Sequence, residues 1–276
     1  MRRSPLALAA PLAALAALAF LVLPVVAIFA HTSPGRLLDQ LSNPVVKDAF
    51  VVSARTSLVA QLLILILGTP TAYLLATRRF RGRWLAVTLV ELPLVLPPAV
   101  AGIGLLVAFG HAGLLGSSLG ALGVSLPFTQ SAVTIAVAFV ASPLYIRQAI
   151  AAFEAVDVDL VAASRTLGAG GTRTFFRVVL PLARIGLIAG LALSFARGLG
   201  EFGATIMFAG SLQQVTQTLP LAIYAEFDVN FDAALAMSAV LVVVSVLLLA
   251  GLRIVLSWQS SSSTTSRFRF GPSISG

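Results

Sequence analysis

The sequence has no cysteine, two histidines and a single lysine, Lys47, among its 276 residues. Without cysteine the chain forms no disulfide and has no thiolate to act as a nucleophile or as a metal ligand. The histidines, His31 and His111, are far apart in the sequence, which argues against metal chemistry. We therefore expect no catalytic residue, no metal and no cofactor in this chain.

Charged residues are also scarce, at 10% of the chain, while 58% of the residues are hydrophobic. A soluble domain carries about 25% charged residues, so this chain could not cover its own surface with polar groups. The mean hydropathy of +1.01 agrees. The apolar residues lie in runs of about 20 or more, long enough to cross a bilayer. The composition excludes an ordinary soluble globule and predicts an all-α membrane protein.

Six apolar runs predict six transmembrane helices, at residues 5–30, 51–76, 84–110, 130–150, 181–210 and 231–258. The first run could be a cleaved signal peptide, but signal cores span about 7–15 residues and this run is longer, which favours a retained anchor. We divide the chain into an N-terminal transmembrane helix (1–30), a core of five transmembrane helices (31–258) and a serine-rich tail (259–276) predicted to be disordered.

Six spans place both termini on the same side of the membrane, and the basic residues divide unequally between the two sides. The loops opposite the termini hold only Arg36 and Lys47. Positive loops remain in the cytoplasm, so we predict that both termini are cytoplasmic. The same placement explains the net charge of +8 without a nucleic acid partner. The arginines on the predicted cytoplasmic side are Arg2, Arg3, Arg78, Arg79, Arg81, Arg83, Arg147, Arg165, Arg173, Arg177, Arg184, Arg253, Arg267 and Arg269.

Three prolines, Pro93, Pro97 and Pro98, interrupt the third span. Each interior proline removes a hydrogen bond and clashes with the preceding turn, so we expect no straight helix here. Broken backbone at membrane depth is tolerated inside protein or beside a water-filled cavity. A bend that lines a translocation pathway at Pro97 and Pro98 and a simple packing kink are equally good interpretations.

The loop at residues 151–181 is long for a connection between spans and predicts a helical hairpin. Asp159 is a fair N-cap for a first helix, and Gly168 with the glycines after it ends that helix. Thr172 can cap a second short helix that ends before Pro181. A hairpin that projects from the membrane suits docking to another protein; the alternative is a loop that lies on its own bundle.

Two charged residues, Arg197 and Glu201, lie inside the fifth apolar run, where each costs roughly 2.5–3.5 kcal/mol to insert. On a continuous helix Ser194, Arg197, Glu201 and Thr205 share one face. Ionisable residues inside a membrane indicate function, so we predict that these four residues border the pathway near an outer gate. The alternative is a structural Arg–Glu pair that locks the helix to a neighbour. The glycines of this stretch make the helix bendable.

The hairpin also carries a pattern that resembles the cytoplasmic signature of permease subunits of ATP-binding-cassette (ABC) importers. The signature reads Glu-Ala-Ala, three residues, Gly, nine residues, Ile, one residue, Leu-Pro. This chain departs from it with Ala162 in place of glutamate and Ser164 in place of alanine, and the spacing matches throughout. The resemblance implies a coupling helix that contacts an ATPase. The matching positions are Ala162, Ala163, Ser164, Gly168, Val178, Leu180 and Pro181.

Residues 92–98, 199–210 and 218–224 closely resemble molybdate permeases. The resemblance implies a type I ABC importer permease fold, a second copy of this chain, a cytoplasmic ATPase dimer and an extracytoplasmic protein that delivers the oxyanion. This chain has no phosphate-binding loop, so ATP and Mg²⁺ are expected on the ATPase. A tungstate or sulfate/thiosulfate permease stays open as an alternative. An ion-coupled secondary transporter and a membrane scaffold without transport activity are rivals from other classes.

Overall fold

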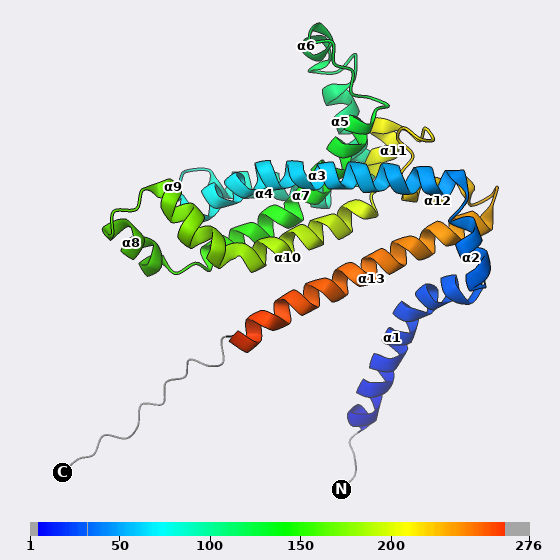
Figure 1. Ribbon diagram of the computed structural model, residues 1–276, viewed down its shortest axis with the longest axis horizontal. Coiled ribbons are helices and arrows are strands. Elements are labelled where there is room, and N and C mark those ends of the chain that lie inside the picture. Colours follow the sequence, from blue (N-terminus) through cyan, green and yellow to red (C-terminus); the bar gives the residue numbers. More distant parts are fainter. Residues whose placement is uncertain (1–4, 32, 263–276) are drawn as a thin grey trace. The chain divides into compact units, whose positions relative to one another are not determined.

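The computed structural model describes the backbone of residues 5–31 and 33–262, and the side chains of residues 11–31 and 33–254 (Figure 1). This part of the chain is helical and contains no β-strand, which confirms the predicted all-α class. The helices are α1 (Pro5–His31), α2 (Pro34–Gln40), α3 (Pro44–Thr77), α4 (Arg83–Val95), α5 (Pro98–Phe109), α6 (Gly116–Ala121), α7 (Gln130–Glu154), α8 (Val158–Thr166), α9 (Gly171–Thr174), the π-helical turn η1 (Phe175–Val179), α10 (Leu180–Leu199), α11 (Gly203–Ala209), α12 (Leu219–Glu226) and α13 (Phe231–Ser262).

The apolar helices agree with the predicted spans. Among residues 5–31 and 33–262, five helices are long and apolar enough to cross a membrane, and the count reaches six if the broken pair α4–α5 is one span. The five unbroken candidate spans contain α1, α3, α7, α10 and α13, in that order. The chain is therefore a multi-pass membrane protein, and the side on which its termini lie stays a prediction.

Several spans extend beyond their predicted ends, α3 and α13 among them. Helix α3 begins at Pro44, because the Asn43 side chain accepts a hydrogen bond from the Val45 amide (3.0 Å) and proline is favoured in a first turn. Helix α13 continues to Ser262, so the first residues of the predicted disordered tail are helical. The rest of that tail, residues 263–276, lies outside the described residues.

The chain forms two compact units that alternate along the sequence: residues 1–58, 98–136 and 199–245 in the first, and 59–97, 137–198 and 246–276 in the second. The first unit packs the start of α3 against α12 and α13. Small side chains, such as Ala49, Ala222 and Ala233, let these helices approach closely. In the same unit α11 lies beside α5 (Figure 1). A Cβ on Gly102 of α5 would lie 2.6 Å from the backbone oxygen of Ala204 in α11.

The second unit is organised around Tyr145 of α7, whose side chain is fully buried. Its hydroxyl hydrogen-bonds Thr69 of α3 at 2.6 Å. A Cβ on Gly68 would meet one edge of the ring at 2.8 Å, and a Cβ on Gly190 of α10 would meet the other at 3.2 Å. Because Gly68 and Gly190 have no side chains, α3 and α10 can pack closely against the ring of Tyr145 in α7.

Candidate functional site

The predicted helical hairpin is present in the second unit. Its first helix, α8, is capped by Asp157, whose carboxylate accepts a hydrogen bond from the Asp159 amide at 2.8 Å. The predicted cap at Asp159 is therefore wrong by two residues, because Asp157 has the extended backbone of an N-cap and Asp159 lies in the first turn. Gly168 ends the helix as predicted, with a left-handed φ of 81°.

Two hydrogen bonds close the end of α8 around Gly168. The Gly168 amide donates to the Arg165 carbonyl (2.9 Å), and the Ala169 amide donates to the Ser164 carbonyl (3.1 Å). This pair defines a Schellman motif, in which the residue at Gly168 must take a left-handed conformation. Glycine takes it without the steric cost that a Cβ brings.

The second half of the hairpin differs from the prediction. Its N-cap is Gly170 rather than Thr172, which lies within α9. The helix does not end before Pro181; α9, η1 and α10 run without a break from Gly171 to Leu199. In a regular α-helix the ring of Pro181 would clash with the carbonyl of Arg177, and the wider π-helical turn lies at that point. The hairpin therefore continues directly into a candidate membrane span.

The signature residues divide between an exposed surface and the inside of the hairpin. Ala162, Ala163, Gly168 and Pro181 are exposed, and Val178 and Leu180 are half-buried. Ser164, which replaces the alanine of the signature, joins the two halves of the hairpin, because its hydroxyl hydrogen-bonds Thr174 of α9 at 3.1 Å.

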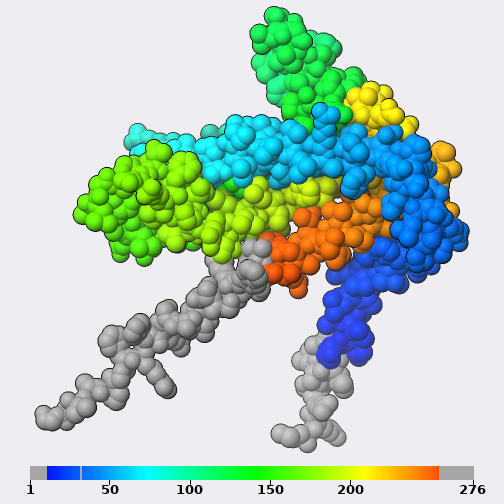
Figure 2. Space-filling model, in the orientation of Figure 1, coloured from blue at the N-terminus to red at the C-terminus, as the bar shows by residue number. Residues whose placement is uncertain are grey.

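The surface of α8 is open in the second unit (Figure 2). None of the residues from Val158 to Thr166, all of which are described, is buried. Leu160 is exposed, and Leu167, directly after the helix, is 87% exposed. Within its own unit the hairpin thus presents apolar side chains outwards, which is a property of a docking element.

The third span is broken at the predicted prolines. Leu96 has extended backbone, and α5 begins at Pro98. Pro97 and Pro98 are both exposed. Within the first unit, a Cβ on Gly203 would lie 2.5 Å from the Cβ of Pro98, so the starts of α5 and α11 are in contact. The predicted break is confirmed, and its role in a pathway stays a prediction.

The four residues predicted to share one helical face do not do so. Helix α10 carries Ser194 and Arg197 and ends at Leu199, Glu201 lies in the break, and Thr205 lies on α11. The glycines near the break disfavour a helix by roughly 0.8–1.0 kcal/mol each. The carboxylate of Glu201, only 2% exposed, accepts a hydrogen bond from the Ala204 amide at 2.7 Å. This bond satisfies one of the free amides in the first turn of α11, so Glu201 stabilises the new start of that helix.

Sequence reasoning missed Gln61, which lies in the middle of α3. The buried hydroxyl of Ser194 donates to the Gln61 side-chain oxygen at 2.9 Å. The Gln61 Nε2 is buried and has no hydrogen-bond partner among the residues that the structure describes. The available signal was one amide inside the apolar run Gln61-Leu62-Leu63-Ile64-Leu65-Ile66-Leu67. A donor held in this way is suited to an anion or a polar partner.

A second group of buried polar side chains lies in the first unit, around the irregular segment 210–218. Ser53 of α3 accepts from the Leu219 amide at 2.7 Å, and Thr216 accepts from the Leu212 amide at 2.9 Å. The hydroxyls of Thr205 and Thr218 are buried without a partner in the described part of the chain. Irregular backbone at membrane depth occurs inside protein or beside a water-filled cavity, so these neutral hydroxyls are candidates to line a pathway.

Comparison with known proteins identifies the family. Residues 64–260 match the family described as "Binding-protein-dependent transport system inner membrane component". The chain is 42% identical over 242 residues to the molybdenum transport system permease protein ModB of Mycobacterium tuberculosis, which covers 87% of this chain and 91% of the relative. It is 37% identical over 214 residues to the sulfate transport system permease protein CysT of Salmonella typhimurium, which covers 76% of each chain.

Solved structures support the fold. The chain resembles a subunit of the MetNI methionine ABC transporter in an inward-facing conformation (TM-score 0.60, 18% identity, 82% of this chain and 99% of that chain). It also resembles a bacterial ABC transporter involved in the import of the polysaccharide alginate (TM-score 0.63, 16% identity, 95% of this chain and 96% of that chain). The type I ABC importer permease fold is thereby confirmed, and the chain belongs to the family of binding-protein-dependent transport system inner membrane components.

Proposed function

We propose that this chain is the membrane-spanning subunit of an ATP-driven importer for molybdate, working as a pair of copies with a cytoplasmic ATPase dimer. The observation that carries the proposal is the exposed hairpin at residues 158–174, which continues without interruption into α10. A relative with 42% identity over 87% of this chain is described as a molybdenum transport system permease. The chain itself performs no chemistry on its substrate.

In this proposal the hairpin transmits the movement of the ATPase. ATP binding closes the ATPase pair and draws the two copies of α8 together. The Schellman motif at Gly168 and the bond between Ser164 and Thr174 keep the hairpin rigid. Because α9, η1 and α10 are continuous, a displacement of the hairpin moves α10 with it. ATP hydrolysis then resets the pathway to face inwards.

The polar groups of the membrane spans support passage rather than tight binding of a dianion. The side chains of Gln61, Thr205 and Thr218 are neutral, and their buried donors have no partner in the described part of the chain, so they can donate hydrogen bonds to an oxyanion without adding positive charge. A row of arginines would hold molybdate too firmly to release it. We therefore assign most of the selectivity to the extracytoplasmic binding protein, and to Arg197 the role of attracting the anion.

Sulfate is the second candidate substrate, because the chain is also 37% identical to a sulfate permease over 76% of its length. Both anions are tetrahedral dianions, so the neutral donors of this chain do not separate them. Uptake decides between the two. In sealed vesicles with the ATPase and the binding protein, labelled molybdate should enter only with ATP. Excess unlabelled molybdate or tungstate should reduce that uptake, and sulfate should not.

The same assay tests the rival classes. Uptake that follows an imposed ion gradient and ignores ATP would identify a secondary transporter. Binding of a cytoplasmic partner without any uptake would identify a scaffold. Uptake of sulfate in preference to molybdate would keep the importer class and replace the substrate.

A further inference from the structure

The second unit contains a cavity of about 930 Å³ that the proposed coupling role does not use. It lies among the end of α3, the loop that follows it, the end of α7 and α8. Four arginines line it, Arg78, Arg79, Arg83 and Arg165, and Glu154 is the one acidic residue among its described lining residues. Four positive charges and one negative charge give this lining a formal charge of +3.

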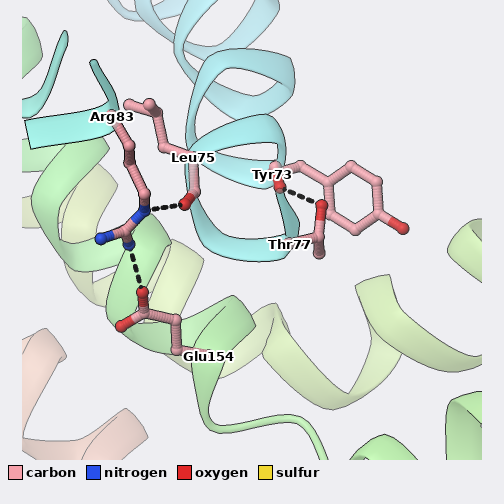
Figure 3. Close-up of polar contacts among 5 residues, drawn as sticks. All are labelled: Tyr73, Leu75, Thr77, Arg83 and Glu154. Atoms are coloured by element: carbon pink, nitrogen blue, oxygen red, sulfur yellow. Dashed lines mark hydrogen bonds and ion pairs between the residues drawn. The ribbon is translucent and has the colours of Figure 1, made fainter. Parts of the chain in front are cut away.

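One of these arginines is fixed in place by the protein (Figure 3). The Nε of Arg83 donates to the carbonyl oxygen of Leu75 at 2.7 Å, and its second nitrogen pairs with Glu154 at 2.6 Å. This contact ties the start of α4 to the end of α3 and the end of α7. The positive charge of Arg83 also compensates the negative charge of Glu154. An incoming anion therefore meets the charges of the exposed Arg78, Arg79 and Arg165.

The cavity is amphipathic as well as basic. Val158, Val161 and Val179 form part of its lining. A small inorganic anion has no apolar part to place against these side chains. A phosphodiester that carries glycerol and acyl chains has both parts, and guanidinium groups bind phosphate oxygens in a bidentate manner.

Two exposed aromatic side chains beside the cavity favour a position of this region near the lipid headgroups. Trp84 is 72% exposed and Phe80 is 44% exposed, and both lie in the segment that contributes Arg83. Exposed tryptophan is enriched at the boundary between membrane and water. Basic pockets between membrane helices at the cytoplasmic boundary bind anionic lipid headgroups.

We propose that this cavity binds the phosphate of an anionic phospholipid, held by Arg78, Arg79 and Arg165. The bound lipid joins the loop after α3 to α8 of the hairpin through its headgroup. The inference does not depend on which oxyanion the importer carries.

The test measures lipid retention on the full-length permease, purified in a neutral detergent, by native mass spectrometry. The probes are phosphatidylglycerol and phosphatidylcholine. We expect phosphatidylglycerol to be retained preferentially. The double variant Arg78→Gln, Arg79→Gln should bind it about thirty-fold more weakly, since a surface arginine accounts for about fivefold in affinity for an anionic membrane.

A matched control removes an arginine outside the cavity. Arg184 of α10 is also exposed and lies on the same predicted side, and it is not part of the lining. Arg184→Gln should retain phosphatidylglycerol as the unmodified protein does. Equal retention of both lipids by the unmodified protein, or an equal loss in both variants, overturns the proposal.

Two further measurements on the unmodified protein identify the source of the phosphate. Inorganic phosphate should leave phosphatidylglycerol bound; displacement of the lipid by inorganic phosphate makes the cavity a general anion site and refutes the lipid assignment. Assembly with the ATPase should also leave the lipid bound. Loss of the lipid on assembly shows that the cavity is part of the protein interface, and refutes the proposal.

Discussion

The contact between α5 and α11 allows a stability prediction with an internal control on the same helix. A Cβ on Gly102 would lie 2.6 Å from the Ala204 carbonyl oxygen and 2.7 Å from the Met207 Cβ, whereas a Cβ on Gly104 would have nothing within 4 Å. Ordinary contact begins at 3.4 Å, so Gly102→Ala requires α11 to move by about 0.8 Å, a shift at which packed atoms lose a quarter to a half of their attraction.

Comparing Gly102→Ala with Gly104→Ala isolates the cost of that displacement. Both substitutions gain the same helix propensity, roughly 0.8–1.0 kcal/mol, because both positions lie in the interior of α5. The difference between the variants is then the overpacking cost, about 1–3 kcal/mol. At about 2–4 °C per kcal/mol, the melting temperature of Gly102→Ala should lie several degrees below that of Gly104→Ala.

The assay is thermal unfolding of the full-length protein in neutral detergent, followed by tryptophan fluorescence. Transport in vesicles is measured in parallel, because the displaced α11 carries Thr205, one of the candidate pathway residues. We expect Gly102→Ala to lose both stability and uptake while Gly104→Ala keeps both. Equal melting temperatures for the two variants would refute the packing of α11 against α5.

Three further predictions concern the hairpin and α10. Gly168→Val should sharply reduce assembly with the ATPase while membrane insertion is unchanged, because φ is 81° there; Gly171→Val, at a position without positive φ, should assemble normally in the same pull-down. Ser164→Ala should destabilise the hairpin by about 0.5–1.5 kcal/mol through loss of the bond to Thr174, seen as faster amide exchange in α8; unchanged exchange would remove that role. Arg197→Ala should reduce uptake more than assembly, and a loss of stability with uptake unchanged would make Arg197 a structural residue.

The spans could be predicted from the sequence because the thickness of the bilayer fixes the length of an apolar run. The break at Pro97 followed from the same kind of rule, since proline has no amide hydrogen and its ring clashes with the preceding turn. Gly168 was predictable because a left-handed residue at the end of a helix is most often glycine. Each of these features depends on a property of one residue type and needs no knowledge of the neighbouring helices.

The end of α10 could not be predicted in this way. The apolar run continues past Leu199, and its spacing alone placed Ser194, Arg197, Glu201 and Thr205 on one face. The point at which α10 ends depends on two effects that the spacing of apolar residues does not report. Glycines weaken the helix, and the Glu201 carboxylate offers the Ala204 amide another acceptor.

Two polar contacts were equally beyond the sequence. Asp157 and Asp159 are the same residue type, and aspartate is favoured at an N-cap. The extended backbone of Asp157 decides which of the two is the cap. The bond between Ser194 and Gln61 joins residues 133 positions apart. Such a contact depends on how two helices pack, which no local pattern specifies.

The ring of Tyr145 has a consequence for how this chain can vary. A Cβ on Gly68 would meet this ring at 2.8 Å and Ile146 at 3.2 Å, and a Cβ on Gly190 would meet the ring at 3.2 Å and Gln148 at 3.1 Å. The tightest contact of an alanine at Gly68 would be with the ring, so shortening Tyr145 should restore part of the lost fit at the expense of the hydrogen bond to Thr69. These positions should change as a set rather than singly, so a double substitution can be tolerated where each single one is not.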